Sequence, residues 1–382
     1  MKRTKVFIIH FQPLELFPPA MNMIDYLGKE KNIQLIVVTN KKSENNPLSE
    51  YVPGGHVKIF RPAKQADRSL ARYINYFIYY LSAFFLLIGH HPGTVMYFET
   101  LSSWPALMYK KIKRKNINLM AHYHEYTEPE LYKQGMFLTR WMHGIEMKMY
   151  NRFSWISQTN PVRLQMFKRD NHLNEMHETG FHVIPNYPPK SWIKIEPKDY
   201  KKNKLKKLVF VGSLGYKNMY LQEVLDWLEN HRDEFSLDVY SYNIDEKAKA
   251  VLEHNVNKNI RYCGGCDYQS LPEILNNYDI GLVIYKPFSQ NTINAVSNKV
   301  FEYLSCGLDV WFSEDMTHTF KYVRKDIYPK VVPVNFSQLN SFDFTSAISK
   351  ENLHYEARPF FYENIYPEMM DCISNDKVGT GI

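Results

Sequence analysis

Two successive series of short apolar runs, alternating with longer helical patterns, constrain the fold of this chain most strongly. In the first series, β-branched and aromatic runs predict buried strands at residues 6–10, 35–39, 95–98, 117–121 and 153–157. Helical patterns lie between them at 19–30, 68–88, 104–115, 127–150 and 160–170. Strands that alternate with helices in this way are typical of a parallel, doubly wound α/β sheet.

The alternation stops near residues 182–189 and restarts after a lysine-rich stretch at 198–207. The second series predicts strands at 208–211, 237–240, 260–262, 280–284 and 310–312, with helices at 219–230, 245–254, 270–277 and 292–305. The whole chain of 382 residues is long enough for two domains.

We therefore predict an N-terminal Rossmann-like domain at 1–188, a linker at 189–205 and a C-terminal Rossmann-like domain at 206–355. A last segment, 356–382, is expected to pack back on the first domain. Parallel α/β sheets bind ligands beyond the carboxyl ends of their strands, so the expected active site is the cleft between two facing domains.

Composition excludes several classes of protein. With 45% apolar and 23% charged residues the chain can bury a full core, so it is not a disordered protein. With only four cysteines we expect no disulfide framework, and because the charged residues at the start lead directly into a strand we expect no secretory signal. We expect a cytoplasmic location.

The net charge of +7 is unevenly distributed. Up to Lys190 there are 25 lysines and arginines against 14 acidic residues, a balance of +11, and the remainder carries −4. An anionic acceptor or a membrane surface suits the first half, and nucleic acid is not expected because no motif for it occurs.

Two segments of the first half bear on the membrane. The aromatic stretch 73–88 is shorter than the roughly 20 residues of a spanning helix, which favours a buried or membrane-facing helix. The run Lys110–Lys115 holds five cations and is either an ordinary helix end or, with 73–88, a peripheral surface for anionic lipid on the inner membrane face.

The helix predicted at 292–306 carries the clearest candidate site. Asn294, Asn298 and Glu302 recur every four residues on one face, and Val296, Val300 and Leu304 form an apolar face. The N-terminus of a helix binds a diphosphate well, and a carboxylate two turns further on can accept hydrogen bonds from ribose hydroxyls. An ordinary solvated helix face is the alternative.

A glycine-containing turn follows the strand at 208–211. Gly212 and Gly215 permit close backbone approach, and Lys217 can neutralise phosphate charge. The spacing matches neither a Walker A loop nor a dinucleotide fingerprint. An unremarkable turn between strand and helix remains the alternative.

Four runs, at 212–217, 260–264, 279–283 and 298–310, follow one another in an order and spacing that resembles a known family. They look like the C-terminal half of a retaining glycosyltransferase of the two-domain GT-B fold, of the family-four type. Pro185-Asn186 resembles the corresponding hinge, and the detailed match covers roughly 182–312.

The resemblance implies a nucleotide-diphosphate-sugar donor on the C-terminal domain and an acceptor on the N-terminal domain. It implies that Glu302 holds the ribose, that Lys217 contacts the diphosphate and that Gly264 lies beside the base. The donor-binding residues expected from the matching runs are Gly212, Ser213, Gly264, Asn294, Asn298, Lys299 and Glu302. Asn294 stands where the family often has a second glutamate, and Ser213 where it often has a basic residue.

The N-terminal counterpart is the strand end Leu119–Tyr126, which contains His122, His124 and Glu125. His124-Glu125 resembles a pair that follows this strand in the family, where a histidine often touches the donor sugar. The catalytic candidates are therefore His124, Lys217 and Glu302. A hydrogen-bonded pair of histidines at a strand end is the alternative reading.

No metal or cofactor is expected. The Asp-x-Asp motif is absent, and Cys263-Gly-Gly-Cys266 lacks a second pair at zinc spacing. We expect metal-independent transfer of a sugar from a nucleotide diphosphate to a glycan or lipid-linked acceptor, in cell-surface polysaccharide synthesis. The alternatives are a non-catalytic sugar-nucleotide-binding scaffold subunit and a sugar-nucleotide epimerase of the same fold.

Overall fold

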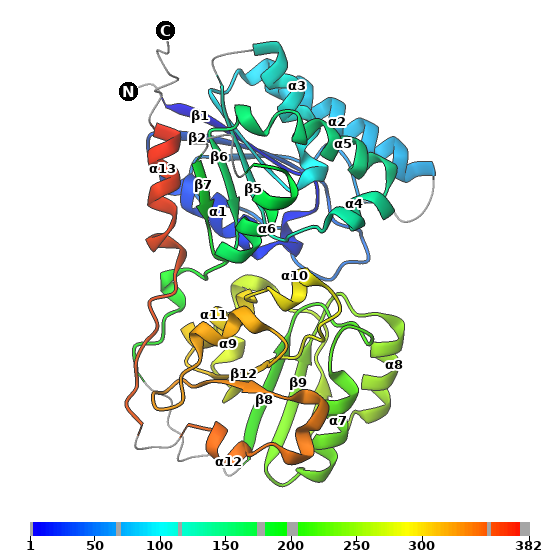
Figure 1. Cartoon of the computed structure of the whole chain (residues 1–382), viewed down its shortest axis with the longest axis vertical. Coiled ribbons are helices and arrows are strands. Elements are labelled where there is room, and N and C mark those ends of the chain that lie inside the picture. Colours follow the sequence, from blue (N-terminus) through cyan, green and yellow to red (C-terminus); the bar gives the residue numbers. More distant parts are fainter. Residues whose placement is uncertain are drawn as a thin grey trace. The chain divides into compact units, whose positions relative to one another are not determined.

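The computed structural model describes residues 3–65, 70–113, 117–173, 180–196, 205–349 and 353–374. It divides into two compact units, Met1–Pro185 with Tyr362–Ile382, and Asn186–Phe361 (Figure 1). Each unit is built on its own parallel sheet, and the two are described below as unit 1 and unit 2.

Unit 1 contains a seven-stranded sheet in the order β3-β2-β1-β4-β5-β6-β7, and every pairing in it is parallel. Its strands are β1 (Thr4–His10), β2 (Ile33–Thr39), β3 (Val57–Phe60), β4 (Thr94–Phe98), β5 (Asn118–Tyr123), β6 (Trp155–Gln158) and β7 (Gly180–Val183). Its helices are α1 (Pro18–Lys29), α2 (Leu70–His90), α3 (Ser103–Lys113), α4 (Pro129–Gln134), α5 (Phe137–Met147), α6 (Pro161–Asp170) and α13 (Tyr366–Ser374).

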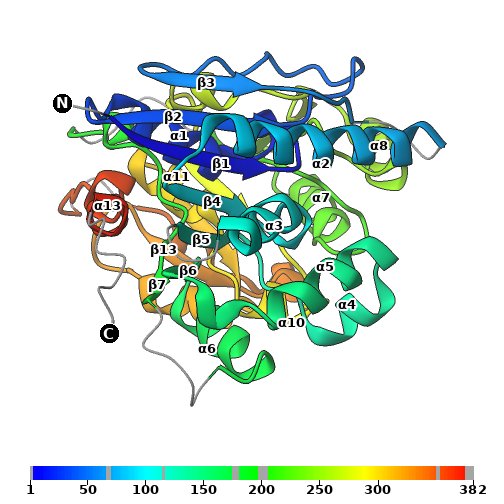
Figure 2. The same ribbon diagram turned by 90° about the horizontal axis from the view of Figure 1, so that it is seen from above.

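The core of unit 1 joins one face of this sheet to three helices. Figure 2 shows α2, α3 and α5 side by side, and α2 packs on α3, which packs on α5. Tyr79 and Leu87 of α2, Leu107 of α3 and Met142 of α5 are buried in one cluster with alternate residues of the strands. Because successive side chains of a strand point to opposite faces of the sheet, alternate apolar residues form the face that packs against these helices.

Unit 2 contains a six-stranded sheet in the order β10-β9-β8-β11-β12-β13, again parallel throughout. Its strands are β8 (Lys206–Val211), β9 (Phe235–Tyr240), β10 (Ile260–Tyr262), β11 (Ile280–Val283), β12 (Asp309–Ser313) and β13 (Val331–Val334). Its helices are α7 (Leu221–Asn230), α8 (Glu246–Asn255), α9 (Leu271–Leu275), α10 (Gln290–Ile293), α11 (Asn298–Ser305) and α12 (Phe344–Ala347).

The predicted α/β class is confirmed, because the chain has two doubly wound, Rossmann-like parallel sheets. The helix expected at 127–150 is wrong, because the chain breaks at Gly135 into α4 and α5. A Cβ at Gly135 would lie 2.8 Å from the carbonyl oxygen of Leu131, so the turn there needs a glycine. Three short strands, β3, β7 and β13, were not expected.

The single helix expected at 292–305 is also wrong. The structure has two helices there, α10 and α11, separated by residues 294–297. Ser297 adopts an extended backbone conformation with ψ 137° and caps α11, because its side chain accepts a hydrogen bond from the backbone N–H of Lys299. A serine at this position competes with helix continuation and favours a new start.

The C-terminal helix α13 belongs to unit 1. The Asn118 side chain donates a hydrogen bond to the carbonyl oxygen of Cys372 at 3.0 Å, and His182 Nδ1 lies 2.7 Å from Glu368 Oε1. Tyr366 packs edge-on against Tyr26 of α1. These contacts attach α13 to three different elements of unit 1.

Candidate functional site

The candidate donor site lies at the carboxyl edge of the unit 2 sheet. Strand order reverses between β8 and β11, because β9 and β10 extend the sheet on one side of β8 and β12 and β13 on the other side of β11. Ligands of open α/β sheets bind at such a switch point. Gly212 follows β8, Tyr285 follows β11, and the residues of α11 come after them in the chain.

Lys299, in the first turn of α11, is buried against the Gly212 turn. Its side chain is 8% exposed, and Gly212 has φ +132°. A Cβ at Gly212 would lie 2.5 Å from Lys299 Cε and 2.7 Å from Lys299 Nζ. A side chain at position 212 would therefore have to displace the Lys299 ammonium group, and the positive φ also favours glycine.

The charge of Lys299 is stabilised by polar neighbours. Burial by itself lowers the pKa of Lys299, but the interactions with Tyr285, Glu302 and Tyr242 outweigh it, so that the pKa lies above its ordinary value. Lys299 Nζ donates a hydrogen bond to the hydroxyl oxygen of Tyr285 at 3.3 Å. A buried, protonated ammonium at the end of a parallel strand is suited to binding an anion.

Glu302 lies one turn after Asn298 on α11 and is 4% exposed. Asn298 and Glu302 share one face of α11, as predicted, and Asn298 Nδ2 donates a hydrogen bond of 2.7 Å to Glu302 Oε1. Burial raises the pKa of Glu302, while Lys299 and the Asn298 hydrogen bond act in the opposite direction. The carboxyl group is thus held in one orientation by a neutral donor and lies in the field of a cation.

The structure brings Gly212, Asn298, Lys299 and Glu302 together, whereas Asn294 and Lys217 lie on other segments. Asn294 ends α10 and donates a hydrogen bond to the Gln290 carbonyl oxygen, so it does not share a helix with Glu302. Lys217 is exposed in the turn before α7. The buried cation of the site is Lys299 and not Lys217.

Two predicted residues lie on neighbouring loops of the same edge. Ser213 is exposed and accepts a hydrogen bond from Asn243 Nδ2 at 3.2 Å. Gly264 follows β10 with φ +73°, and its carbonyl oxygen accepts a hydrogen bond from the Ser241 N–H at 2.7 Å. A Cβ at Gly264 would meet no atom within 4 Å.

Sequence reasoning missed Tyr242 and Tyr285. Tyr285 is the hydrogen-bond partner of Lys299. Burial raises the pKa of Tyr242 above its ordinary value, and the charge of Lys299 acts in the opposite direction. Both tyrosines come within two residues of the end of a strand, β9 and β11 respectively. That position in a parallel sheet was the signal available, since all strand ends meet at one edge.

A second polar cluster occupies the carboxyl edge of the unit 1 sheet. His124 directly follows β5, its ring stacks on Phe98 with centroids 5.1 Å apart, and it meets the His122 ring edge-on at 4.7 Å. His122 Nδ1 lies 2.8 Å from Ser157 Oγ. Burial lowers the pKa of His122 to about 3 and that of His10 to about 4, so both rings are neutral at pH 7.

Glu99 belongs to this cluster and was not predicted. It follows β4, next to the switch point between β1 and β4, and has φ 61° and ψ 154°, a backbone region used almost only by glycine. Its Oε1 accepts hydrogen bonds from the backbone N–H groups of His124, at 2.6 Å, and Glu125, at 3.3 Å. Burial, together with the charge of Glu125, raises the pKa of Glu99 to about 8.

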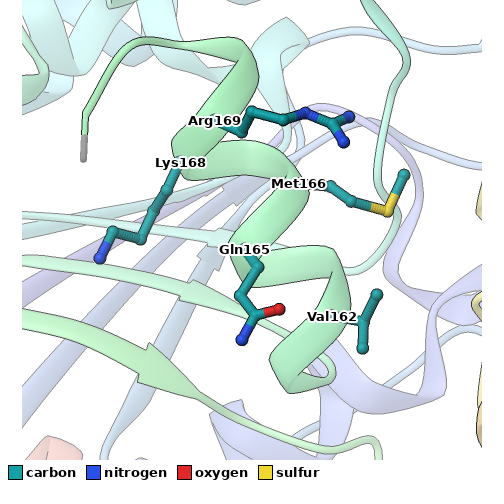
Figure 3. Close-up of a pocket in the computed structure, with 5 residues that line it drawn as sticks. All are labelled: Val162, Gln165, Met166, Lys168 and Arg169. Carbon is teal, nitrogen blue, oxygen red and sulfur yellow. The ribbon is translucent and has the colours of Figure 1, made fainter.

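In the part of the chain that the structure describes, neither a group of metal ligands nor the surface pocket on α6 coincides with these two clusters. Among the residues that the structure describes, no three His, Cys, Asp or Glu side chains are grouped to hold a metal ion. A surface pocket on α6 is lined by Val162, Gln165, Met166, Lys168 and Arg169 (Figure 3). None of these five residues belongs to the predicted site.

Comparison with known proteins identifies the fold. No protein-family model and no curated protein matches the chain. Among solved structures, HepE of Anabaena in complex with UDP and glucose has a TM-score of 0.63 at 11% sequence identity. The match covers 97% of this chain and 100% of the HepE chain. Sucrose-phosphate synthase of Thermosynechococcus elongatus has a TM-score of 0.61 at 13% sequence identity, and the match covers 97% of this chain and 98% of the synthase chain.

The UDP-GlcNAc 2-epimerase of Neisseria meningitidis bound to UDP-GlcNAc is similar as well. Its TM-score is 0.57 at 12% identity, with 97% of this chain and 99% of that chain covered. Sucrose-phosphate synthase and the epimerase therefore share the fold of this chain over nearly its whole length, and the predicted GT-B fold is confirmed.

Proposed function

We propose that the protein is a glycosyltransferase that takes its sugar from a nucleotide-diphosphate donor. The observation that carries the proposal is the Lys299–Gly212–Glu302 cluster at the switch point of unit 2. Lys299 and the N–H groups that begin α11 would bind the diphosphate, and Glu302, oriented by Asn298, would accept hydrogen bonds from the ribose hydroxyls. This assignment replaces Lys217 by Lys299 as the principal diphosphate contact.

UDP is the first nucleotide to test. HepE, which has the same fold, was solved with UDP and with UDP and glucose. The proposed reaction forms a bond between an acceptor hydroxyl oxygen and the anomeric carbon and breaks the bond between that carbon and the diphosphate. The nucleoside diphosphate leaves with the electron pair, and the proton of the acceptor hydroxyl is released with it. Lys299 would neutralise the developing charge without a metal ion, and a retaining outcome follows from the family resemblance alone.

The acceptor is proposed to be a glycan or a lipid-linked glycan in cell-surface polysaccharide synthesis. A solved structure of the same fold, described as the lipopolysaccharide outer core galactosyltransferase WaaB, has a TM-score of 0.58 at 12% identity and supports this class. On unit 1, His124 and Glu99 are the groups at the carboxyl edge that would contact the reacting sugars. All four cysteines are free thiols, which supports a cytoplasmic location.

The direct test is calorimetric titration with UDP. Glu302→Gln keeps the size of the side chain but removes its charge, so we expect UDP affinity to fall by about 1–3 kcal/mol, the range for a charge-assisted hydrogen bond. Glu273→Gln, at an exposed position in α9, is the matched control and should bind UDP like the wild type. Equal affinity of wild type and Glu302→Gln would remove the proposed ribose contact.

Turnover separates the transferase from its two alternatives. A glycosyltransferase consumes a UDP-sugar only when a glycan or lipid-linked acceptor is present, and it releases UDP. An epimerase converts UDP-GlcNAc without an acceptor, and a scaffold subunit binds the nucleotide sugar without consuming it. Epimerisation of UDP-GlcNAc by the purified chain alone would overturn the proposal.

A further inference from the structure

Exposed apolar side chains of unit 1 are concentrated on one helical layer. Among the described residues of unit 1, eleven of the twelve large apolar side chains that are exposed lie on α2, α3, α4 and α5 or directly between α4 and α5. They are Tyr73, Ile74, Phe77, Ile78, Phe85, Ile112, Leu131, Met136, Phe137, Trp141 and Met147. The twelfth is Val52, and we call this group of four helices the α2–α5 layer.

Exposure on this layer is large for individual side chains. Phe137 is 73% exposed, Phe77 66% and Phe85 64%. Soluble domains scatter such residues singly, and a concentration of them marks a surface that contacts a partner or a membrane. Aromatic side chains are the type enriched at the interface between lipid and water.

The charge on the same layer is almost entirely positive. Its helices contain six cations, Arg72, Lys110, Lys111, Lys113, Lys133 and Arg140, and two acidic residues, Glu130 and Glu146. Glu146 is fully buried and accepts a hydrogen bond from the Tyr97 hydroxyl, so Glu130 is the one acidic side chain among these that reaches the surface. The layer therefore combines aromatic groups with cations that an anionic partner would complement.

The lysines at the C-terminal end of α3 differ in how far they are exposed. Lys110 is half-buried, its Nζ donates a hydrogen bond to the Ile117 carbonyl oxygen at 2.6 Å, and burial lowers its pKa. Lys111 and Lys113 are exposed, with the exposed Ile112 between them. Arg114 and Lys115, the other cations of the basic run, lie outside the described residues.

Helix α2 is held on the surface of unit 1. In the part of the chain that is described, it is the one helix long and apolar enough to cross a membrane, with a mean hydropathy of 1.3 over Ala71–His90. However, the Tyr79 hydroxyl donates a hydrogen bond to the Val38 carbonyl oxygen and the Tyr80 hydroxyl to that of Leu101. Spanning a bilayer would break these bonds and expose the core that α2 covers.

We propose that the α2–α5 layer docks unit 1 on an anionic lipid bilayer, with α2 lying in the plane of the interface. The exposed aromatic side chains would enter the boundary between headgroups and acyl chains, and Lys111 and Lys113 would lie among the phosphates. This surface is separate from the donor cluster of unit 2, and the proposal does not depend on the proposed activity.

Vesicle co-sedimentation tests the proposal with the full chain. Wild-type protein should bind phosphatidylcholine vesicles that contain phosphatidylglycerol, should bind pure phosphatidylcholine much less, and should dissociate as salt is raised, because screening shortens the range of the attraction. Lys111→Gln with Lys113→Gln should weaken binding about fivefold for each lysine. Lys258→Gln with Lys325→Gln makes the same charge change at exposed sites of unit 2 and should leave binding unchanged.

The aromatic contribution is tested separately. Phe77→Ser with Phe85→Ser should weaken vesicle binding by about tenfold or more for each residue, whereas Phe288→Ser with Phe320→Ser, both exposed in unit 2, should not. Circular dichroism and the melting temperature of each variant establish that it is folded.

Three outcomes would overturn the proposal. Wild type and both unit 1 variants sediment alike, or binding does not require phosphatidylglycerol, or the wild type is a dimer that the phenylalanine variants convert to a monomer without any vesicle binding. The last result would show that a second copy of the chain covers the layer. Wild-type binding that both unit 1 variants weaken and both unit 2 controls preserve would establish membrane docking.

Discussion

The fit between Gly212 and Lys299 can be measured by a double-mutant cycle. An alanine Cβ at 212 would lie 2.5 Å from Lys299 Cε and 2.7 Å from its Nζ, about 1 Å closer than ordinary van der Waals contact. Lys299 has to move, because it is the flexible side of the contact, and it then loses its 3.3 Å hydrogen bond to Tyr285. Alanine also pays about 1–3 kcal/mol for the backbone conformation at φ +132°.

The two costs separate when Lys299 is absent. In the Lys299→Ala background, Gly212→Ala keeps the backbone strain but loses the clash, so the two substitutions should be less than additive. The coupling should be about 0.5–3 kcal/mol, and its upper limit is what a hydrogen bond of a charged group contributes. Gly264→Ala is the control, because Gly264 also has a positive φ but its added Cβ would meet no atom within 4 Å. It should couple to Lys299→Ala by no more than about 0.5 kcal/mol.

Urea unfolding followed by circular dichroism provides the free energies for the cycle. If the two units unfold in separate transitions, the shifts should be confined to one of them, since both residues belong to unit 2. Strict additivity of Gly212→Ala and Lys299→Ala would refute the packing of Lys299 against the Gly212 turn. It would equally remove the reason for placing the buried cation of the donor site at Lys299.

Three further predictions concern the two clusters. Lys299→Met should weaken UDP binding about 10–100-fold, and Lys217→Met, which changes an exposed lysine, should weaken it by less than about threefold in the same calorimetric titration. Turnover of the UDP-sugar should persist in excess EDTA, and loss of turnover that Mg²⁺ or Mn²⁺ restores would contradict the role given to Lys299. Glu99 has a folded-state pKa of about 8 against an ordinary value of 4.5, so it contributes stability below about pH 4.5 that is lost as the pH rises through 8. Glu99→Gln should therefore lose less unfolding free energy than the wild type between pH 5 and 9 in urea titrations, and parallel curves would show that Glu99 titrates normally.

The fold could be predicted from sequence because its central strands are continuous apolar runs. Val6–His10 and Ile280–Ile284 are buried on both faces of their sheets, which makes their signal strong. The three strands that were not expected lack this signal. Val57–Phe60 and Gly180–Val183 are edge strands with partly exposed residues, and Val331–Val334 contains a proline.

The candidate site could be predicted only in part. Asn298, Lys299 and Glu302 share a short helix, so their proximity follows from local spacing. Glu99 joins its cluster through the pairing of β4 with β5, and Tyr285 through the pairing of β11 with β8, which a local sequence pattern does not contain. The choice between Lys217 and Lys299 depended on burial, and a lysine on a turn and a lysine on a helix look alike in a sequence.

The break between α10 and α11 brings the elements of the donor site together. In one continuous helix from residue 292, the nearest free N–H groups would lie about one turn before Lys299 and about two turns before Glu302. Because Ser297 starts a new helix at Asn298, the N-terminus of α11 and the positive end of its dipole lie beside Lys299 and one turn from Glu302. The same segment then offers a cation, backbone donors and an oriented carboxyl group to a ligand that is itself anionic at its diphosphate and rich in hydroxyls at its ribose. The irregular segment 294–297, which interrupts the expected helix, is thus what allows Gly212, Lys299 and Glu302 to form one site.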